Sequence, residues 1–115
     1  MSKRPYSAIR KAGDFLFVSG QTGFNPDDGA IGESIEEQTE QTLKNIRSLL
    51  EQNGAKMDDV IKCSVFLSDT EEFKQMNSVY IKFFKDPPPA RTTVGAQLAS
   101  SKMKVEIDAI AYVSE

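Results

Sequence analysis

Histidine and tryptophan are absent from this chain of 115 residues, and cysteine occurs once, at Cys63. With no histidine and one cysteine, the chain lacks the side chains for an ordinary zinc site or a Ser-His-Asp triad. One cysteine cannot form a disulfide within the chain, which favours a reducing compartment. Catalytic chemistry must therefore come from Arg, Lys, Asp, Glu, Tyr, Ser or Thr side chains, or from backbone groups.

Long apolar runs and an excess of positive charge are also missing. No apolar segment approaches the roughly 20 residues that span a bilayer, and the opening MSKRPYSAI lacks the apolar core of a secretion signal. The chain carries 14 Lys and Arg against 17 Asp and Glu, which gives a net charge of -3. Because nonspecific nucleic-acid binding needs clustered positive charge, we expect no nucleic-acid partner. These absences predict a cytoplasmic protein with no membrane partner.

The residues that are present predict one domain, 1–115, of mixed secondary structure. A turn signal, Gly13-Asp14, separates two short β-favouring pieces and predicts a hairpin. A helix is expected from about 34 to 53, because Ser34 and Glu37 have the spacing of a capping box and apolar residues repeat along one face.

The second half of the chain predicts a strand over 60–67, a helix over 69–84 and two strands over 91–96 and 104–113. The prolines at 87–89 are expected to close the second helix, because a residue before proline is pushed away from helical geometry. The order ββαβαββ predicts an α+β fold, one sheet with two helices packed on one of its faces.

The residues of the last strand, 104–113, place apolar side chains on both sides of the sheet. Ile110 and Tyr112 share the side of the strand that carries Glu106, whereas the other side is uniformly apolar. A face of this kind is expected to be covered, and a symmetric oligomer is the simplest cover.

Arg91 and Glu106 are the first candidates for chemistry. A guanidinium can hold a substrate carboxylate through two hydrogen bonds, and a nearby glutamate can hold water or move a proton. If the strands over 91–96 and 104–113 are neighbours, they bring the two side chains together. A structural ion pair, or a solvent-exposed arginine, fits the same spacing.

Four further residues are candidates with a packing alternative for each. Ser19 and Gly20 follow an apolar strand and offer a hydroxyl and backbone amides, or they are an ordinary turn. Tyr6 and Asn77 are either contacts of the fold or groups that reach a ligand. Cys63 lies in a strand pattern and is interpreted as a small buried apolar residue rather than a nucleophile.

The chain as a whole resembles the reactive intermediate deaminase (Rid, or YjgF-type) family, which is also labelled L-PSP endoribonuclease or translation inhibitor. The resemblance is carried in order by RPYSAI, FLFVSGQTGFNP, EEQTEQTLKNIRSLLEQNGAKMDDVIKCSVFLSD, FKQMNSVYIKFF, PPPARTTVGA and KVEIDAIA. It implies a chorismate-mutase-like fold and a homotrimer with a central barrel and clefts between subunits. It also implies hydrolysis of enamines and imines, such as 2-aminoacrylate (2-iminopropanoate) and 2-iminobutanoate, to 2-keto acids and ammonia, without metal or cofactor.

The resemblance assigns roles by position. It implies that Arg91 binds the substrate carboxylate and that Glu106 positions or activates water, and it places the remaining binding residues at Tyr6, Ser19, Gly20, Asn77 and Thr93. Thr93 stands where many members have cysteine, Asp108 where glutamate is commoner, and Ala8 and Arg4 also depart from the family pattern.

Two other functions stay open at this point. A regulatory module that binds a 2-keto acid without turnover would use the same arginine. A ribonuclease or translation inhibitor, as in the older family labels, fits poorly with the acidic balance and the absence of histidine.

Overall fold

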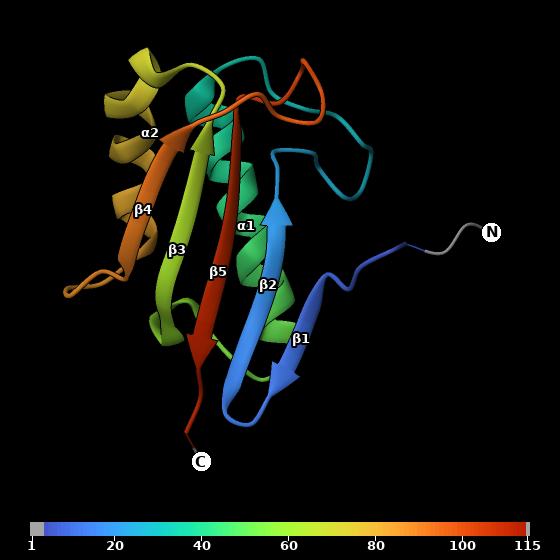
Figure 1. Cartoon of the computed structure of the whole chain (residues 1–115), viewed down its shortest axis with the longest axis vertical. Coiled ribbons are helices and arrows are strands. Elements are labelled where there is room, and N and C mark those ends of the chain that lie inside the picture. The colour runs from blue at the N-terminus through green and yellow to red at the C-terminus, as the bar shows by residue number, and fades with distance from the viewer. Residues whose placement is uncertain (1–3, 115) are drawn as a thin grey trace.

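A five-stranded sheet with helices on one face forms the described part of the chain, residues 4–114, in the computed structural model (Figure 1). The predicted order ββαβαββ and the α+β class are confirmed. In chain order the elements are β1 (Ile9–Ala12), β2 (Phe15–Gln21), α1 (Ile35–Gln52), β3 (Val60–Leu67), α2 (Phe73–Tyr80), β4 (Ala90–Gly95) and β5 (Val105–Tyr112). Short 3-10 turns lie at Met57–Asp59, Thr70–Glu72 and Ile81–Phe83.

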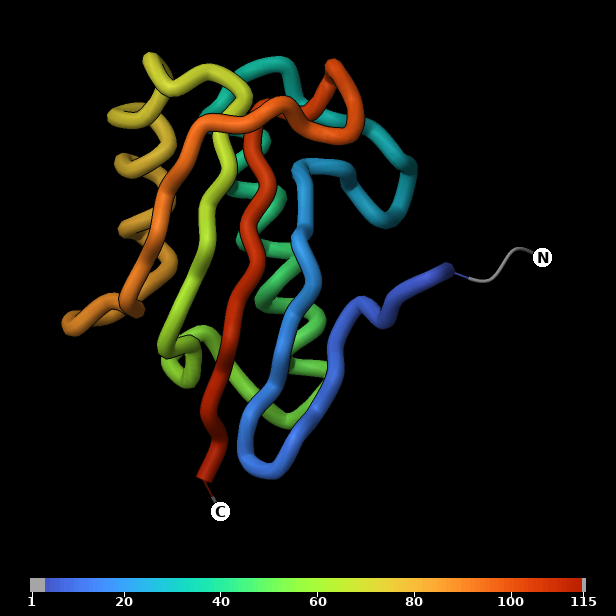
Figure 2. Tube along the Cα trace, in the orientation of Figure 1, coloured from blue at the N-terminus to red at the C-terminus, as the bar shows by residue number. Residues whose placement is uncertain are grey.

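The strands are arranged in the order β1-β2-β5-β3-β4. The prediction that β4 and β5 are neighbours is therefore wrong, because β3 lies between them. β4 runs parallel to β3, and a parallel pair needs a crossover connection, which α2 supplies. From the end of β4 the chain passes over the sheet end through residues 96–104 and returns as β5 beyond β3 (Figure 2).

Helix α1 begins and ends as its sequence predicts. The Ser34 side chain accepts from the backbone N–H of Glu37, and the Glu37 carboxylate accepts from the backbone N–H of Ser34. The hydrogen bond from the Ser34 backbone N–H lowers the pKa of the Glu37 carboxyl group, and further hydrogen bonds to that carboxylate from the Ser34 hydroxyl and the Glu33 backbone N–H lower it as well. Gly54 follows the helix with a φ of 80°, a conformation that favours glycine.

The buried face of α1 carries polar residues as well as leucine and isoleucine. Gln38 is buried, and its Nε2 donates to the carbonyls of Gly32 and Lys102 at 2.8 and 2.9 Å. Its Oε1 accepts from the backbone N–H of Lys104 at 2.7 Å. One amide thereby joins the loop before α1 to the loop before β5, and so fixes the start of the strand that carries Glu106.

The second helical segment differs from its prediction. Instead of one helix over 69–84, a 3-10 turn capped by Asp69 leads into α2, and another 3-10 turn follows Tyr80. The regular helix therefore ends well before the prolines at 87–89, which begin the extended approach to β4. Tyr80, at the end of α2, is buried, whereas Phe73, at its start, is 40% exposed.

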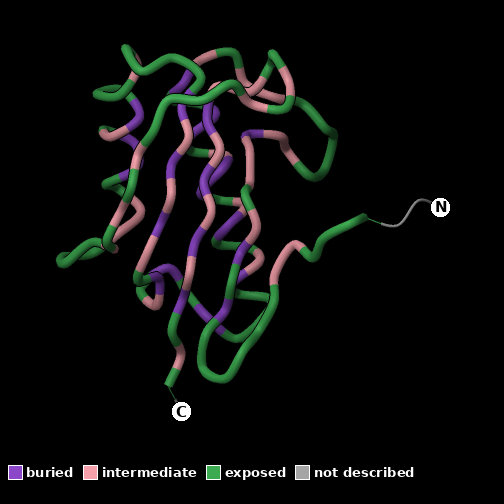
Figure 3. Tube along the Cα trace, in the orientation of Figure 1, coloured by how far each residue is buried: buried purple, intermediate pink, exposed green. Residues whose placement is uncertain are grey.

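Buried residues alternate with more exposed ones along β2, β3 and β5 (Figure 3), so the two faces of the sheet are unequal. The face under the helices is buried and contains alternate residues of β2, β3 and β5, including Val18, Val65 and Ile107. The opposite face exposes the rings of Phe15, Phe17 and Tyr112. The ring centroid of Phe15 lies 5.2 Å from that of Tyr112 and 6.3 Å from that of Phe17. This open apolar face agrees with the expectation from the alternation in the last strand.

Candidate functional site

Arg91 lies in β4 and directs its side chain to the α2 side of the sheet. It pairs in register with Cys63 of β3, a buried residue on that side. Its Nη1 donates to Oδ1 of Asn77 at 2.7 Å. Its Cζ lies 4.8 Å from the ring centroid of Tyr80 and 5.6 Å from that of Phe73. The guanidinium is thus fixed by one amide and two aromatic rings, contacts that favour a cation.

The support below Arg91 is apolar and uncharged. Tyr80 is 3% exposed, and burial raises the pKa of its hydroxyl far above the ordinary value, with the neighbouring Cys63 thiol as a second cause. Burial also raises the pKa of the Cys63 thiol. Both groups therefore stay neutral near pH 7, and the interpretation of Cys63 as a small buried apolar residue is confirmed.

An open pocket of about 550 Å³ adjoins Arg91. Its walls come from one face of α2 and from the proline segment: Lys74, Asn77, Ser78, Tyr80, Ile81, Pro88, Pro89 and Arg91. Thr93 follows Arg91 on the same side of β4, and its hydroxyl is buried without a hydrogen-bond partner among residues 4–114. Arg91 and Asn77 are therefore brought together as one half of the candidate site.

Glu106 lies on the other face of the sheet, beside Gly20. A Cβ atom added at Gly20 would come within 2.8 Å of Cδ of Glu106 and closer still to its Oε2, so glycine is what allows this approach. The register of β2 against β5 shifts between Val18 and Gln21, which places Gly20 at an irregularity in the ladder. Within residues 4–114 the Glu106 carboxylate has no hydrogen bond or ion pair.

Ser19 and Tyr6 lie near Gly20 rather than near Arg91. The Ser19 hydroxyl donates to the backbone carbonyl of Ser7, and the Ser19 N–H donates to the carbonyl of Ala8. Its hydroxyl proton is thus used to hold the N-terminal segment. Tyr6 on that segment is 59% exposed and, with Gly20, lines a second pocket of about 450 Å³ between β2 and α1.

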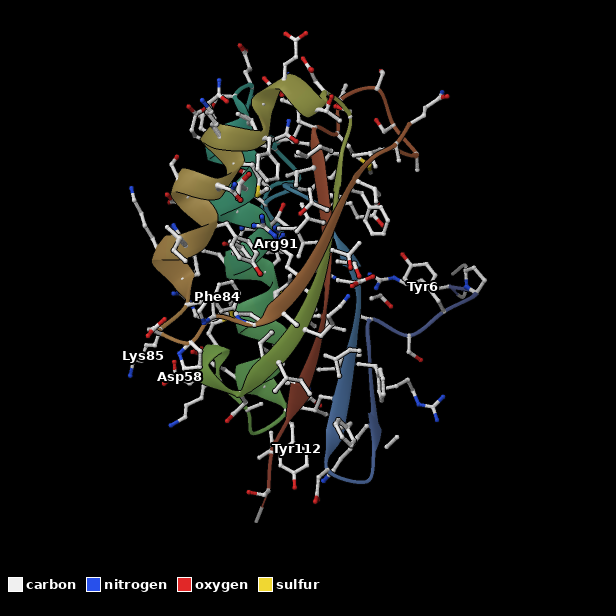
Figure 4. The ribbon with its side chains drawn as sticks, turned by 60° about the vertical axis from the view of Figure 1, so that its left-hand side comes forward. Tyr6, Asp58, Phe84, Lys85, Arg91 and Tyr112 are labelled. Carbon is white, nitrogen blue, oxygen red and sulfur yellow. The ribbon has the colours of Figure 1, made fainter. Side chains whose placement is uncertain are left out.

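The predicted residues therefore form two groups rather than one site. Figure 4 shows Arg91 beneath α2 and Tyr6 at the far edge of the molecule. Arg91 and Glu106 project from opposite faces of the sheet and from strands separated by β3, so the single chain does not bring them together. The contacts of Phe73 and Tyr80 with Arg91 were not predicted, because the sequence does not show which side chains meet the ring faces of a neighbouring helix.

Comparisons with known proteins identify the class to which this fold belongs, the Rid-type α+β domain. The chain is a member of the family described as endoribonuclease L-PSP, whose model matches residues 1–113. The resemblance to the Rid/YjgF family inferred from sequence is therefore confirmed.

Individual relatives agree over most of the chain. A RutC family protein of Pyrococcus horikoshii is 43% identical over 109 residues, which are 94% of this chain and 86% of the relative. The chloroplastic Reactive Intermediate Deaminase A of Arabidopsis thaliana is 41% identical over 108 residues, 93% of this chain and 58% of the relative. The crystal structure of E. coli TdcF with bound serine matches with a TM-score of 0.91 and 30% identity, covering 98% of this chain and 91% of that one.

None of the helices in residues 4–114 combines the length and the apolar character of a membrane-spanning segment. No three or more His, Cys, Asp or Glu side chains gather there as a set of metal ligands.

Proposed function

We propose that this protein is an enamine/imine deaminase that hydrolyses 2-imino acids, such as 2-iminopropanoate and 2-iminobutanoate, to 2-keto acids and ammonia. The observation that carries the proposal is the setting of Arg91. Its guanidinium is fixed by a neutral amide and two rings, and no carboxylate of residues 4–114 pairs with it. A fixed guanidinium with free N–H groups in a pocket is suited to a substrate carboxylate.

The proposed reaction needs an acid–base group and water. The imine carbon of a protonated 2-imino acid is electrophilic, and water adds to it as its C–O bond forms and the C=N electron pair moves to nitrogen. Glu106 accepts one proton from that water and returns it to the nitrogen. The C–N bond then breaks with its electron pair leaving on ammonia, and Glu106 takes the remaining hydroxyl proton as the carbonyl forms. Arg91 contributes by holding the carboxylate, so that the carbon is presented in one place.

The separation of Arg91 from Glu106 leads us to propose that the complete site lies between copies of the chain. In a homotrimer with cyclic symmetry, each copy would contribute its Arg91 half to one cleft and its Glu106 half to the next. The open sheet face with Phe15, Phe17 and Tyr112 is the surface that such an assembly would cover, around a central barrel.

The chain is proposed to act as one Rid-type domain over 1–115, without a metal or cofactor, in the cytoplasm. The single cysteine supports a reducing compartment, while the Arabidopsis relative is named as chloroplastic. The roles of Tyr6, Ser19, Gly20, Asn77 and Thr93 in binding belong to the same proposal.

A module that binds a 2-keto acid without turnover would show ligand affinity and no ammonia release.

Mixing two inactive variants tests the shared site. Arg91→Ala and Glu106→Gln are purified, dissociated, mixed in equal amounts and reassembled, and ammonia release is measured on 2-iminobutanoate generated in situ. Each variant alone should retain very little activity. Random reassembly should restore about a quarter of wild-type activity, because one site in four then pairs an intact Arg91 with an intact Glu106.

The matched control is each variant dissociated and reassembled alone, which should regain no activity. Persistent inactivity of the mixture, although mixed oligomers form, would contradict a site shared between copies. Wild-type turnover by Arg91→Ala alone would contradict the deaminase proposal itself.

A further inference from the structure

Lys74 is a second cation on the Arg91 pocket. It is the second residue of α2, and it shares one helix face with Asn77, Ser78 and Ile81, because residues three, four and seven positions apart lie above one another. All four line the pocket, and Asn77 on this face contacts Arg91 directly. The helix therefore places the Lys74 stem about one turn from the residue that fixes the guanidinium.

The charge of this pocket is unbalanced. Its lining contains Lys74 and Arg91 and no Asp or Glu, in a chain whose net charge is -3. The ion pairs within residues 4–114 join Lys44 to Glu40, Lys85 to Asp58 and Lys104 to Glu72, and none involves the pocket cations. One substrate carboxylate would neutralise Arg91 alone and leave Lys74 without a partner.

The acids that precede α2 give Lys74 no ion pair. Glu72 in the turn before the helix pairs with Lys104, and Lys74 has no ion pair within residues 4–114. An anion that enters the pocket would therefore be the partner of the Lys74 ammonium group. The adjoining pocket walls of Ile81, Pro88 and Pro89 are apolar and reduce the water available to screen the charges.

We propose that Lys74 selects 2-imino acids with a second carboxylate in the side chain, the class formed by oxidation of aspartate or glutamate. Arg91 holds the carboxylate next to the imine carbon, and Lys74 pairs with the side-chain carboxylate. This inference rests on the proposed imine deaminase function and specifies its substrate class. The reaction that supplies the substrate is then the oxidation of an acidic amino acid.

Product binding isolates this selectivity from turnover. Calorimetric Kd values are measured for 2-oxoglutarate and for 2-oxobutanoate, which differ by the distal carboxylate, on wild type, Lys74→Met and Lys82→Met. Methionine keeps the length of the lysine stem and removes its charge. Lys82 is the matched control, because it is also exposed and close in sequence but lines a different groove, beside Glu40 and Arg47.

The wild type should bind the dicarboxylate more tightly, and Lys74→Met should lower the ratio of affinities about fivefold, the size expected for one exposed ion pair. Lys82→Met should keep the wild-type ratio. The same order should hold for kcat/KM on imino acids generated from glutamate and from 2-aminobutyrate by an amino-acid oxidase. An equal ratio in wild type and Lys74→Met would overturn the inference.

The two proposals fail in different ways. Turnover of 2-iminobutanoate with no preference for the dicarboxylate would leave the deaminase function standing and remove the role of Lys74. A dicarboxylate preference that depends on Lys74, with no ammonia release from any imino acid, would support the binding inference and contradict the proposed hydrolysis.

Discussion

The Arg91 region and the Glu106 region of the molecule differ in how far one chain completes them. Arg91 is fixed inside the chain by Asn77 and Tyr80, and an apolar pocket wall stands beside it. Glu106 lies on the open face of the sheet, beside Gly20, without a hydrogen bond or ion pair within residues 4–114. In the isolated chain the first region is an oriented guanidinium beside a pocket, whereas the second is a carboxylate without a partner among residues 4–114.

This difference assigns separate tasks to the two regions. A guanidinium that is already oriented loses little conformational freedom when it grips a carboxylate, so affinity should depend on the Arg91 region. A glutamate that acts on water contributes to the chemical step, so turnover should depend on both regions. Variants that separate binding from turnover therefore test the comparison directly.

Arg91→Ala should have the largest effect and should alter binding and turnover together. We expect 2-keto acid affinity and kcat/KM to fall on the order of 100-fold, as when one charged partner of a desolvated pair is removed. Arg91→Lys should recover little of the loss, because an ammonium group cannot make the paired hydrogen bonds. Calorimetry and ammonia release measure the two quantities, and circular dichroism checks the fold.

Glu106→Gln is the contrasting variant. It should bind the 2-keto acid like the wild type and lose most turnover, since an amide cannot accept the proton from water. Equal losses of affinity in Glu106→Gln and Arg91→Ala would show that the two regions do not divide the tasks in this way.

Gly20→Ala should have an intermediate effect confined to the Glu106 region. The new Cβ would overlap the Glu106 carboxylate, which must turn away because it is the mobile end of a side chain. We expect kcat to fall about tenfold, in keeping with displacement of a general base, with the Kd of 2-oxobutanoate changed far less. The control is Ala8→Gly, which removes a methyl group from the pocket that Gly20 also lines and adds no volume. A second glycine-to-alanine change, Gly29→Ala, is not a suitable control, because the positive φ of Gly29 favours glycine.

Asn77→Ala should have the smallest effect on kcat among these variants and should act through Arg91. Losing a hydrogen bond to a charged group should weaken 2-keto acid binding about tenfold, with KM raised more than kcat is lowered. Tyr80→Phe is the matched comparison, since it keeps the ring over the guanidinium and removes only the hydroxyl. Equal affinity of Asn77→Ala and wild type would show that the two aromatic rings suffice to orient Arg91.

Local signals made much of the fold predictable. The capping box at Ser34, the turn at Gly13-Asp14 and the alternation in the last strand act over a few residues, so the sequence specifies them without knowledge of the rest. The apolar, β-favouring residues around Cys63 likewise predicted that it is buried. The expectation that β4 and β5 are neighbours was wrong, because strand order depends on pairing between strands that are distant in sequence. β4 pairs in parallel with β3, to which α2 connects it.

The sequence by itself determined the order of elements, the chemistry on offer and the family, because these depend on local propensity, composition and residue pattern. Only the tertiary structure decided which of those residues meet. It placed Arg91 against Asn77, Tyr80 and Phe73, brought Glu106 against Gly20, and left the two groups on opposite faces of one sheet. The physical reason is that side chains alternate between the faces of a strand and that β3 lies between β4 and β5, neither of which follows from spacing along the chain.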